Sequence, residues 1–187
     1  MRLKQLSLLA LLLIALLVAG CSGNVPASEL TVNDTGKIVD KQPAKGNQAQ
    51  DMMKLTVYYA KKDAMNLVAE VHEVPKSSHP AQTALELLAA APSSGDLVST
   101  LPQGTKVRGI AVKDHVAVVD FSDAIIKNNP GGSTTESLLV GAVVNTLTEF
   151  SDIHKVQILV EGKKVESLTG HVDVSEPLSR SEKIIKK

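Results

Sequence analysis

The chain of 187 residues has room for one ordinary domain and a tether, but not for two domains of usual size. Apolar residues make up 43% of the sequence and aromatic residues only 2%, so the core must be aliphatic. The aromatic residues Tyr58, Tyr59, Phe121 and Phe150 are too few to form stacking platforms for single-stranded nucleic acid or glycans. The formal net charge of zero gives no electrostatic reason to expect nucleic acid as a partner.

Residues 1–20 have the layout of a signal peptide, with Arg2 and Lys4 followed by an apolar run. The run is shorter than the about 20 residues that a membrane-spanning helix needs. It ends in Val18, Ala19, Gly20 and Cys21, which resembles the lipobox of bacterial lipoproteins. We expect cleavage before Cys21 and lipid on its thiol, with acyl chains such as palmitate holding the protein on the membrane. The alternative is an ordinary cleaved signal, or an uncleaved anchor with an incidental cysteine.

Residues 21–51 predict a lipid-anchored, flexible linker, because they are rich in small and polar residues and show no sustained apolar period. Regular patterning follows, so we place one domain at 52–175 and a polar, fraying C-terminal tail at 176–187. Within the domain, β-branched and alternating residues predict strands at 55–60 and 67–74.

A helix and a β-hairpin are expected next. Ser78 is the expected N-cap of a helix that has Pro80 in its first turn and ends at Pro92. The run 105–121 predicts a hairpin that turns at Asp114-His115, although the usual two-residue turn would carry glycine.

The main core helix is expected to begin at a capping box formed by Ser133 and Glu136, and its apolar spacing continues to Phe150. Val140 and Val144 widen the apolar face of this helix, which indicates that it is covered on more than one side.

A strand at 154–160 follows this helix, and residues 172–174 could add a short last strand. The predicted order is therefore β-β-α-β-β-α-β. This order indicates an α+β fold, a mostly antiparallel sheet with two main helices packed on one face.

We expect no catalytic residue, metal or cofactor. The five histidines form no His-x-His pair and no helical pair four residues apart, so a metal site would need proximity created by the fold. Asp120 and Asp123 could act as an acid–base pair, but a strand end and a helix cap are the simpler interpretation. Asn145 on an apolar helix face is either a partner contact or a structural hydrogen bond to a nearby loop, and we favour the second.

Four stretches with a common order and spacing carry a resemblance to a known family. They are ALELLAAAP (84–92), LPQGTKVRGIAVKDHVAVVDFS (101–122), TESLLVGAVVNTLTEF (135–150) and VQILVEGKKVESLTGHV (156–172). Their most characteristic residues include Pro102, Gly104, Asp120, Asn145, Thr146 and Gly162. In these stretches the chain resembles the GerMN domain family over about residues 55–174. It departs from tandem members of that family because it has room for only one such domain.

The resemblance implies a non-catalytic domain, similar in fold to the ring-building motif, that packs against other extracytoplasmic domains in ring or channel assemblies. We therefore expect a module on the extracytoplasmic face of the cell membrane that acts in sporulation or germination by assembling with other envelope proteins. The alternative is a lipoprotein that binds a peptidoglycan fragment or a small solute, which needs a pocket with converging polar groups. An envelope hydrolase is least favoured, because the sequence shows no nucleophile paired with a base.

Overall fold

The computed structural model describes residues 51–186. The predicted signal peptide, the lipobox with Cys21, and nearly all of the predicted linker lie outside the described residues. Among residues 51–186, no helix has both the length and the apolar character needed to cross a membrane.

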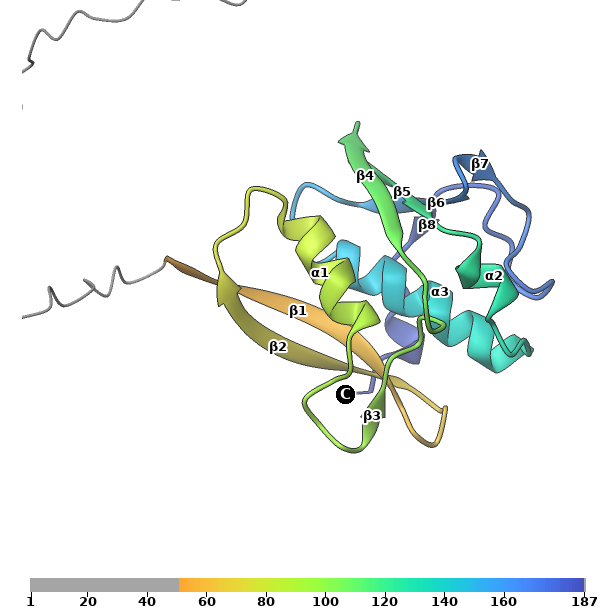
Figure 1. Cartoon of the computed structure of the whole chain (residues 1–187), viewed down its shortest axis with the longest axis horizontal. Helices are drawn as coiled ribbons and strands as arrows, with labels where there is room; N and C mark the ends of the chain where they lie inside the picture. The colour runs from red at the N-terminus through yellow and green to blue at the C-terminus, as the bar shows by residue number, and fades with distance from the viewer. Residues whose placement is uncertain (1–50, 187) are drawn as a thin grey trace, which may run out of the picture. The chain divides into compact units, whose positions relative to one another are not determined.

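The described residues form eight strands, three α-helices and one 3₁₀ helix (Figure 1). In chain order these are β1 (Met52–Lys61), β2 (Leu67–Pro75), α1 (Pro80–Ala89), β3 (Leu97–Val98), β4 (Val107–Lys113), β5 (Val116–Phe121), α2 (Ala124–Lys127), α3 (Ser133–Leu147), β6 (Lys155–Val160), β7 (Lys163–Lys164), β8 (Leu178–Ser179) and the 3₁₀ helix η1 (Glu182–Ile184).

The strands divide into two sheets. One has the order β2-β1-β3, and the other has the order β4-β5-β6-β7, with β8 also paired to β6. Every pairing between these strands is antiparallel except β5 with β6, which are parallel because α2 and α3 connect them. The predicted α+β class and the mostly antiparallel pairing are therefore confirmed, and the structure adds that the strands form two sheets.

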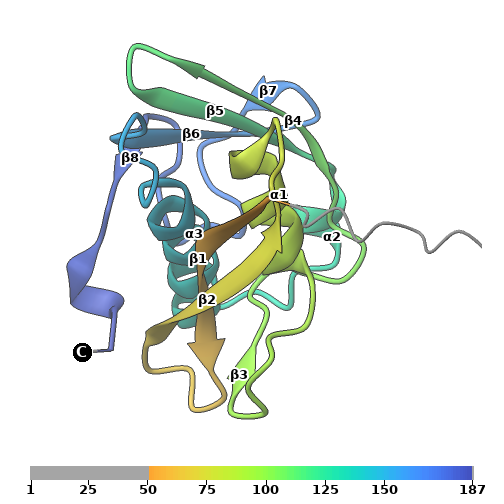
Figure 2. The same ribbon diagram turned by 90° about the vertical axis from the view of Figure 1, so that its left-hand side faces the viewer.

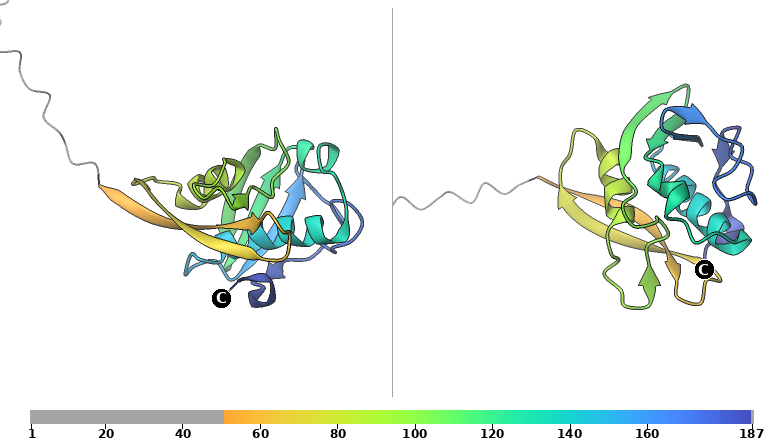
Figure 3. Two further views of the ribbon diagram at one scale, coloured as in Figure 1. Left: turned by 90° about the horizontal axis from the view of Figure 1, so that it is seen from below. Right: turned by 45° about the vertical axis from the view of Figure 1, so that its right-hand side comes forward.

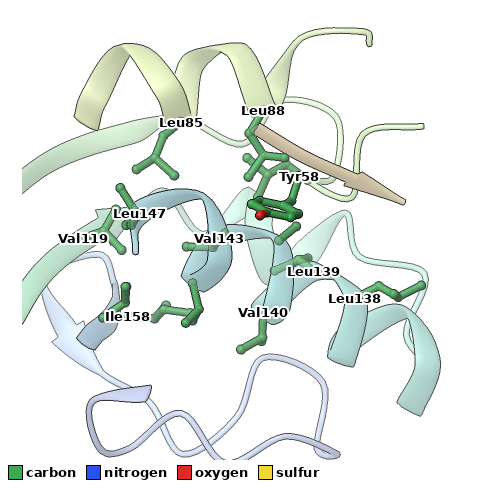
Figure 4. Packing of buried hydrophobic residues seen from close by; sticks show 14 of the residues in the cluster. Tyr58, Leu85, Leu88, Val119, Leu138, Leu139, Val140, Val143, Leu147 and Ile158 are labelled. Atoms are coloured by element: carbon green, nitrogen blue, oxygen red, sulfur yellow. The ribbon is translucent and has the colours of Figure 1, made fainter. Parts of the chain in front are cut away.

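Both long helices contact the two sheets. Helix α1 contacts β1 and β4, helix α3 contacts β1 and β6, and the helices also contact each other. Figure 2 shows α3 between the β1–β2 hairpin and the sheet that contains β6. Figure 4 shows Leu147 on the side of α3 that faces Leu85 and Val119, and Val140 on the opposite side. Helix α3 is therefore buried on several sides, as Val140 and Val144 had indicated.

Strand β1 reaches both helices, because successive side chains of a strand point to opposite faces. The hydroxyl of Tyr59 donates a hydrogen bond to the carbonyl oxygen of Leu87 in α1 at 2.7 Å. The backbone N–H of Tyr58 donates to Oγ1 of Thr146 in α3 at 3.1 Å, and the hydroxyl of Tyr58 donates to Glu149 at 2.7 Å. The hairpin thus ties α1 and α3 together, and this explains why both faces of 55–60 are largely buried.

The predicted hairpin between β4 and β5 is confirmed. Its turn residues Asp114 and His115 have φ of 50° and 62°. These are the left-handed values that a type I′ turn needs at both positions. The turn therefore forms without glycine, since Asp and His adopt this region more readily than most residues.

The structure corrects two predictions about helix N-caps and refines a third. Helix α1 has Pro80 at its start as predicted, but its N-cap is His79 rather than Ser78. Helix α3 has Gly132 as N-cap and no side-chain cap, so the Ser133–Glu136 capping box is wrong. Asp123 does occupy the N-cap position of α2, but its carboxylate pairs with Lys127 at 2.5 Å instead of capping the helix.

The C-terminal strap, defined as residues 177–186, is packed on the domain, so the expectation of a fraying tail is wrong. Its strand β8 pairs with Lys155 and Val156 of β6, and the backbone N–H of Lys186 donates to the carbonyl oxygen of Leu67 at 2.8 Å. The strap therefore runs from one sheet to the other (Figure 3). The last strand lies at 178–179, and the predicted strand at 172–174 does not form.

Between its two ends the strap crosses α3. A Cβ atom on Gly141 would overlap Cδ1 of Ile184, so the absence of a side chain at this position of α3 lets the strap approach closely. Arg180 of the strap contacts Glu149 at 2.8 Å, and its guanidinium lies 5.1 Å from the centre of the Tyr58 ring.

Candidate functional site

The predicted motif residues Pro102 and Gly104 form a tight turn before β4. The backbone N–H of Thr105 donates to the carbonyl oxygen of Pro102 at 3.1 Å, and Gly104 has a φ of 83°, which glycine adopts without strain. Asn128, at the end of α2, donates through Nδ2 to the carbonyl oxygen of Gln103 at 2.8 Å. These contacts give Pro102 and Gly104 a structural role, because they fix the turn before β4 to the end of α2.

Asp120 and Gly162, which lie 42 residues apart in the chain, are brought together by the β5–β6 pairing. The backbone N–H of Gly162 donates to Oδ1 of Asp120 at 2.8 Å, while Arg108 donates through Nε to Oδ2 at 2.9 Å. Arg108 also contacts Glu161, and the hydrogen bond that Arg108 donates to Asp120 is the main reason why the pKa of Arg108 is raised. Both oxygens of Asp120 are thus engaged in structural contacts, which does not favour the acid–base interpretation.

We predict that Gly162→Ala lowers the free energy of unfolding by about 1 kcal/mol. Gly162 has a φ of 75°, which alanine adopts only with strain, although nothing lies within 4 Å of an added Cβ. Urea unfolding followed by circular dichroism measures the change. Gly95→Ala is the matched control, because Gly95 has no positive φ and the same open space, and an equal loss in both variants would contradict the prediction.

Asn145 and Thr146 are adjacent residues of α3, and their side chains contact different parts of the fold. Thr146 accepts the hydrogen bond from the backbone of Tyr58 in β1. Asn145, which is fully buried, donates through Nδ2 to the carbonyl oxygen of Ser181 at 3.0 Å and accepts the N–H of Ser181 through Oδ1 at 2.9 Å. The structural interpretation of Asn145 is therefore supported, with the C-terminal strap as its partner.

Glu136 is a key residue whose role sequence reasoning missed. Its fully buried carboxylate accepts five hydrogen bonds from the loop after β7. The donors are the hydroxyls of Ser167 and Thr169 and the backbone N–H groups of Leu168, Thr169 and His171. Burial raises the pKa of Glu136, but the hydrogen bonds outweigh it and lower the pKa to about 2. The carboxylate is therefore ionised and fixes the loop onto α3.

The histidines are distributed over several structural contacts. His115 and His154 stack with ring centres 4.4 Å apart at the tip of the β4–β5 hairpin. His72 lies 2.9 Å from Glu70, whose carboxylate also accepts the N–H of Ser93 at 3.0 Å. Among residues 51–186, no group of three or more histidine, cysteine, aspartate or glutamate side chains is arranged to hold a metal ion.

Tyr59 lies beside the Glu70–His72 pair but acts as a structural donor. Burial, and then the negative charge of Glu70, raise the pKa of Tyr59 to about 12. Its hydroxyl is therefore neutral at physiological pH and donates a hydrogen bond to the carbonyl oxygen of Leu87. Tyr59 thus does not resemble an activated nucleophile.

Two of the pockets in the described domain differ clearly in their lining. A pocket of about 460 Å³ is formed by the loop 166–175, where Asp173 already accepts hydrogen bonds from the N–H and hydroxyl of Ser175. A second, more apolar pocket of about 200 Å³ lies beside β4. Its lining includes Pro80, Ala81, Ile110, Val112, Phe150 and Ile153. The first pocket is built from a single loop, so it gives little support to a solute-binding function.

One edge of the larger sheet is open. Strands β7 and β8 occupy the outer edge of β6 at opposite ends, whereas β4 pairs only with β5 among the described strands. Val112 of β4 is also 43% exposed and is one of the exposed large apolar side chains of the described domain. Strand β4 and the apolar pocket beside it therefore form a surface that is suited to contact another protein.

Comparison with known proteins relates this fold to sporulation proteins. Residues 56–166 match the family model "Germane: Sporulation and spore germination". The chain is 30% identical over 172 residues to the spore germination protein GerM of Bacillus subtilis, and the match covers 89% of this chain but only 44% of GerM. The C-terminal strap and most of the loop that binds Glu136 follow the residues that match the family model.

Solved structures agree with the sequence match. The first GerMN domain of B. subtilis GerM superposes with a TM-score of 0.60 at 28% identity, covering 68% of this chain and 98% of that domain. The tandem GerMN domains of the same protein give a TM-score of 0.61 at 29% identity, covering 69% of this chain and 46% of the tandem structure. A candidate lipoprotein from Clostridium perfringens gives 0.51 at 29% identity, covering 68% of this chain and 87% of that structure. Since the family model also spans more than half of the sequence, the chain belongs to the Germane family of GerMN domains.

Proposed function

We propose that this protein is a lipid-anchored module on the extracytoplasmic face of the cell membrane that acts in sporulation or spore germination by binding other envelope proteins. The family match and the similarity to GerM support the biological process. The observation that carries the binding role is the open edge of β4 with an apolar pocket beside it. The prominent polar side chains of the described domain, such as Glu136, Asn145 and Asp120, bind this chain's own backbone.

The lipid anchor is supported by the sequence of the leader and by one structural relative. Val18, Ala19, Gly20 and Cys21 have the residue types of a lipobox, and the similar C. perfringens structure is described as a candidate lipoprotein. An N-terminal lipid followed by a linker would leave the GerMN domain free to meet partners near the membrane surface.

We expect Cys21→Ser to abolish incorporation of an alkyne-labelled palmitate into the protein, because serine lacks the thiol that accepts the lipid. In-gel fluorescence of the immunoprecipitated full-length protein measures the label. Ser22→Ala is the matched control and should keep it. A label that persists in Cys21→Ser would contradict the lipid anchor.

Cross-linked co-purification of the tagged full-length protein from membranes tests the binding role. Vegetative and starved cells are compared, and we expect envelope proteins to be recovered with a yield that rises in starved cells. If no protein is recovered in either state, the interaction function is wrong.

A further inference from the structure

The C-terminal strap can leave the described domain without opening its core. None of the strap residues 177–186 is fully buried, whereas Gly141 and Asn145 of α3 beneath it are. The chain before the strap is fixed, because Val174 is fully buried and donates its backbone N–H to the carbonyl oxygen of Glu166 at 2.8 Å. Segments with little buried surface open locally at a lower free energy than the whole domain. Local opening is therefore expected to begin at the strap.

The groove under the strap is matched to the sequence of the strap. The side chain of Asn145 bonds both the N–H and the carbonyl oxygen of Ser181. The missing side chain of Gly141 leaves a notch for Ile184, since a Cβ atom there would overlap Cδ1 of Ile184. Residues 178–179 pair with β6 at the other end of the groove. An occupant therefore needs a short strand followed at fixed spacing by an aliphatic side chain.

A charged contact adds to this selection. Arg180 donates to the hydroxyl of Tyr58 at 2.5 Å and to the carbonyl oxygen of Asn145 at 3.1 Å, and it contacts Glu149 at 2.8 Å. When the strap leaves, Glu149 loses its cation and the buried amide of Asn145 loses both of its partners, which is costly. The empty groove is therefore expected to recapture a strap rather than to stay open.

The hinge before the strap is short. Ser175 is held by Asp173, whose carboxylate accepts both the N–H and the hydroxyl of Ser175. Only Glu176 and Pro177 separate this anchored residue from β8, and the chain bends at 175–176. A residue before proline favours extended backbone, so Glu176 favours a straightened hinge. A straightened hinge carries the strap away from its own domain, and short hinge loops invite exchange of such a segment between copies.

We propose that two copies of this chain exchange their C-terminal straps, so that Arg180 and Ile184 of each copy occupy the groove on α3 of the other. The groove selects this occupant, because a second copy supplies the strand, the arginine and the isoleucine at the required spacing. The contacts that are lost when the strap opens are regained between the copies, so exchange has a low cost. Because β6 is covered again in both copies, the assembly closes at two.

Two single charge reversals test the exchange. Arg180→Glu and Glu149→Arg each place like charges at residues 149 and 180, both within one copy and between identical copies. In a mixture, exchange joins the two substituted positions in one groove and the two unchanged residues in the other. The full-length proteins are mixed in an excess of detergent micelles. A tag on one variant should recover at least about tenfold more of the other variant than of an untagged copy of itself.

Hydrogen exchange followed by mass spectrometry locates the contact. Each single variant should lose protection in residues 178–186 when it is alone and should regain it in the mixture. The double variant Arg180→Glu/Glu149→Arg is the matched control. It carries opposite charges within one chain, so its strap should be protected without a partner variant.

The proposal is overturned if the mixed pair recovers no more partner than the identical copies do. It is also overturned if the mixed pair is recovered while residues 178–186 stay unprotected, because the copies then join at another surface. Protection that returns in the double variant but not in the mixture would show that the strap binds only its own domain. Strap exchange involves neither β4 nor a different protein, so its failure leaves the proposed function standing.

Discussion

Glu136→Gln is expected to lower the free energy of unfolding at neutral pH by about 3 kcal/mol, the largest loss that we predict for one substitution. The native carboxylate is buried and accepts five hydrogen bonds. A glutamine would remove the charge and turn an amide N–H₂ toward donors that then lose their acceptor. Urea unfolding of the purified protein measures the loss.

The contribution of Glu136 should also depend on pH in a defined direction. The pKa of its carboxyl is about 2 in the folded state, compared with an ordinary value of 4.5. A lowered folded-state pKa means that the stabilisation is complete above about pH 4.5 and is lost as the pH falls toward 2. The difference corresponds to about 3 kcal/mol. The wild type should therefore lose stability over this range, while Glu136→Gln should be less sensitive to acid.

Glu166→Gln is the matched control for this prediction. Glu166 is an exposed carboxylate in the same part of the chain, and surface substitutions of this kind usually change stability by less than about 0.5 kcal/mol. If the two variants lose equal stability at neutral pH, or if Glu136→Gln keeps the full acid sensitivity of the wild type, the buried carboxylate does not have the assigned role.

Local patterns predicted the elements of this fold better than its long-range polar contacts. The alternation of apolar residues placed β4, β5 and β6, and the periodicity of 138–150 placed α3, because these signals depend on neighbours in the sequence. Glu136 was misassigned since Ser133-x-x-Glu136 also fits a capping box. Its actual donors lie more than 30 residues further along the chain, where a single sequence gives no signal of proximity.

The same limit applies to the candidate binding surface. The sequence predicted β4 as one strand of a hairpin, but an open edge is a property of the whole sheet. That β4 is the open side of this sheet depends on β7 and β8 covering the opposite side at β6, and β8 lies in a charged segment that looks like a solvated tail. The motif residues Asp120 and Gly162 were identified by resemblance, whereas their direct hydrogen bond became visible only when β5 and β6 were paired.

Asn145→Ala is expected to lower the free energy of unfolding by about 2 kcal/mol and to loosen the C-terminal strap. The substitution removes both hydrogen bonds to the backbone of Ser181 and leaves a gap in the buried face of α3. Hydrogen exchange followed by mass spectrometry should show faster exchange in residues 178–186, with β5 unchanged. Ser137→Ala, an exposed position on the same helix, should leave both measurements as in the wild type.

Loosening of the strap is also expected to change the assembly state of the protein. If the strap detaches, β8 leaves Lys155 and Val156, and the sheet then has an open edge on β6 as well as on β4. With two open edges, β4 of one copy can pair with β6 of the next copy, and such an assembly need not close into a ring. Asn145→Ala should therefore self-associate with rising concentration in analytical ultracentrifugation. A variant that loses stability but stays monomeric, with the strap still protected from exchange, would show that Asn145 stabilises α3 without keeping the β6 edge closed.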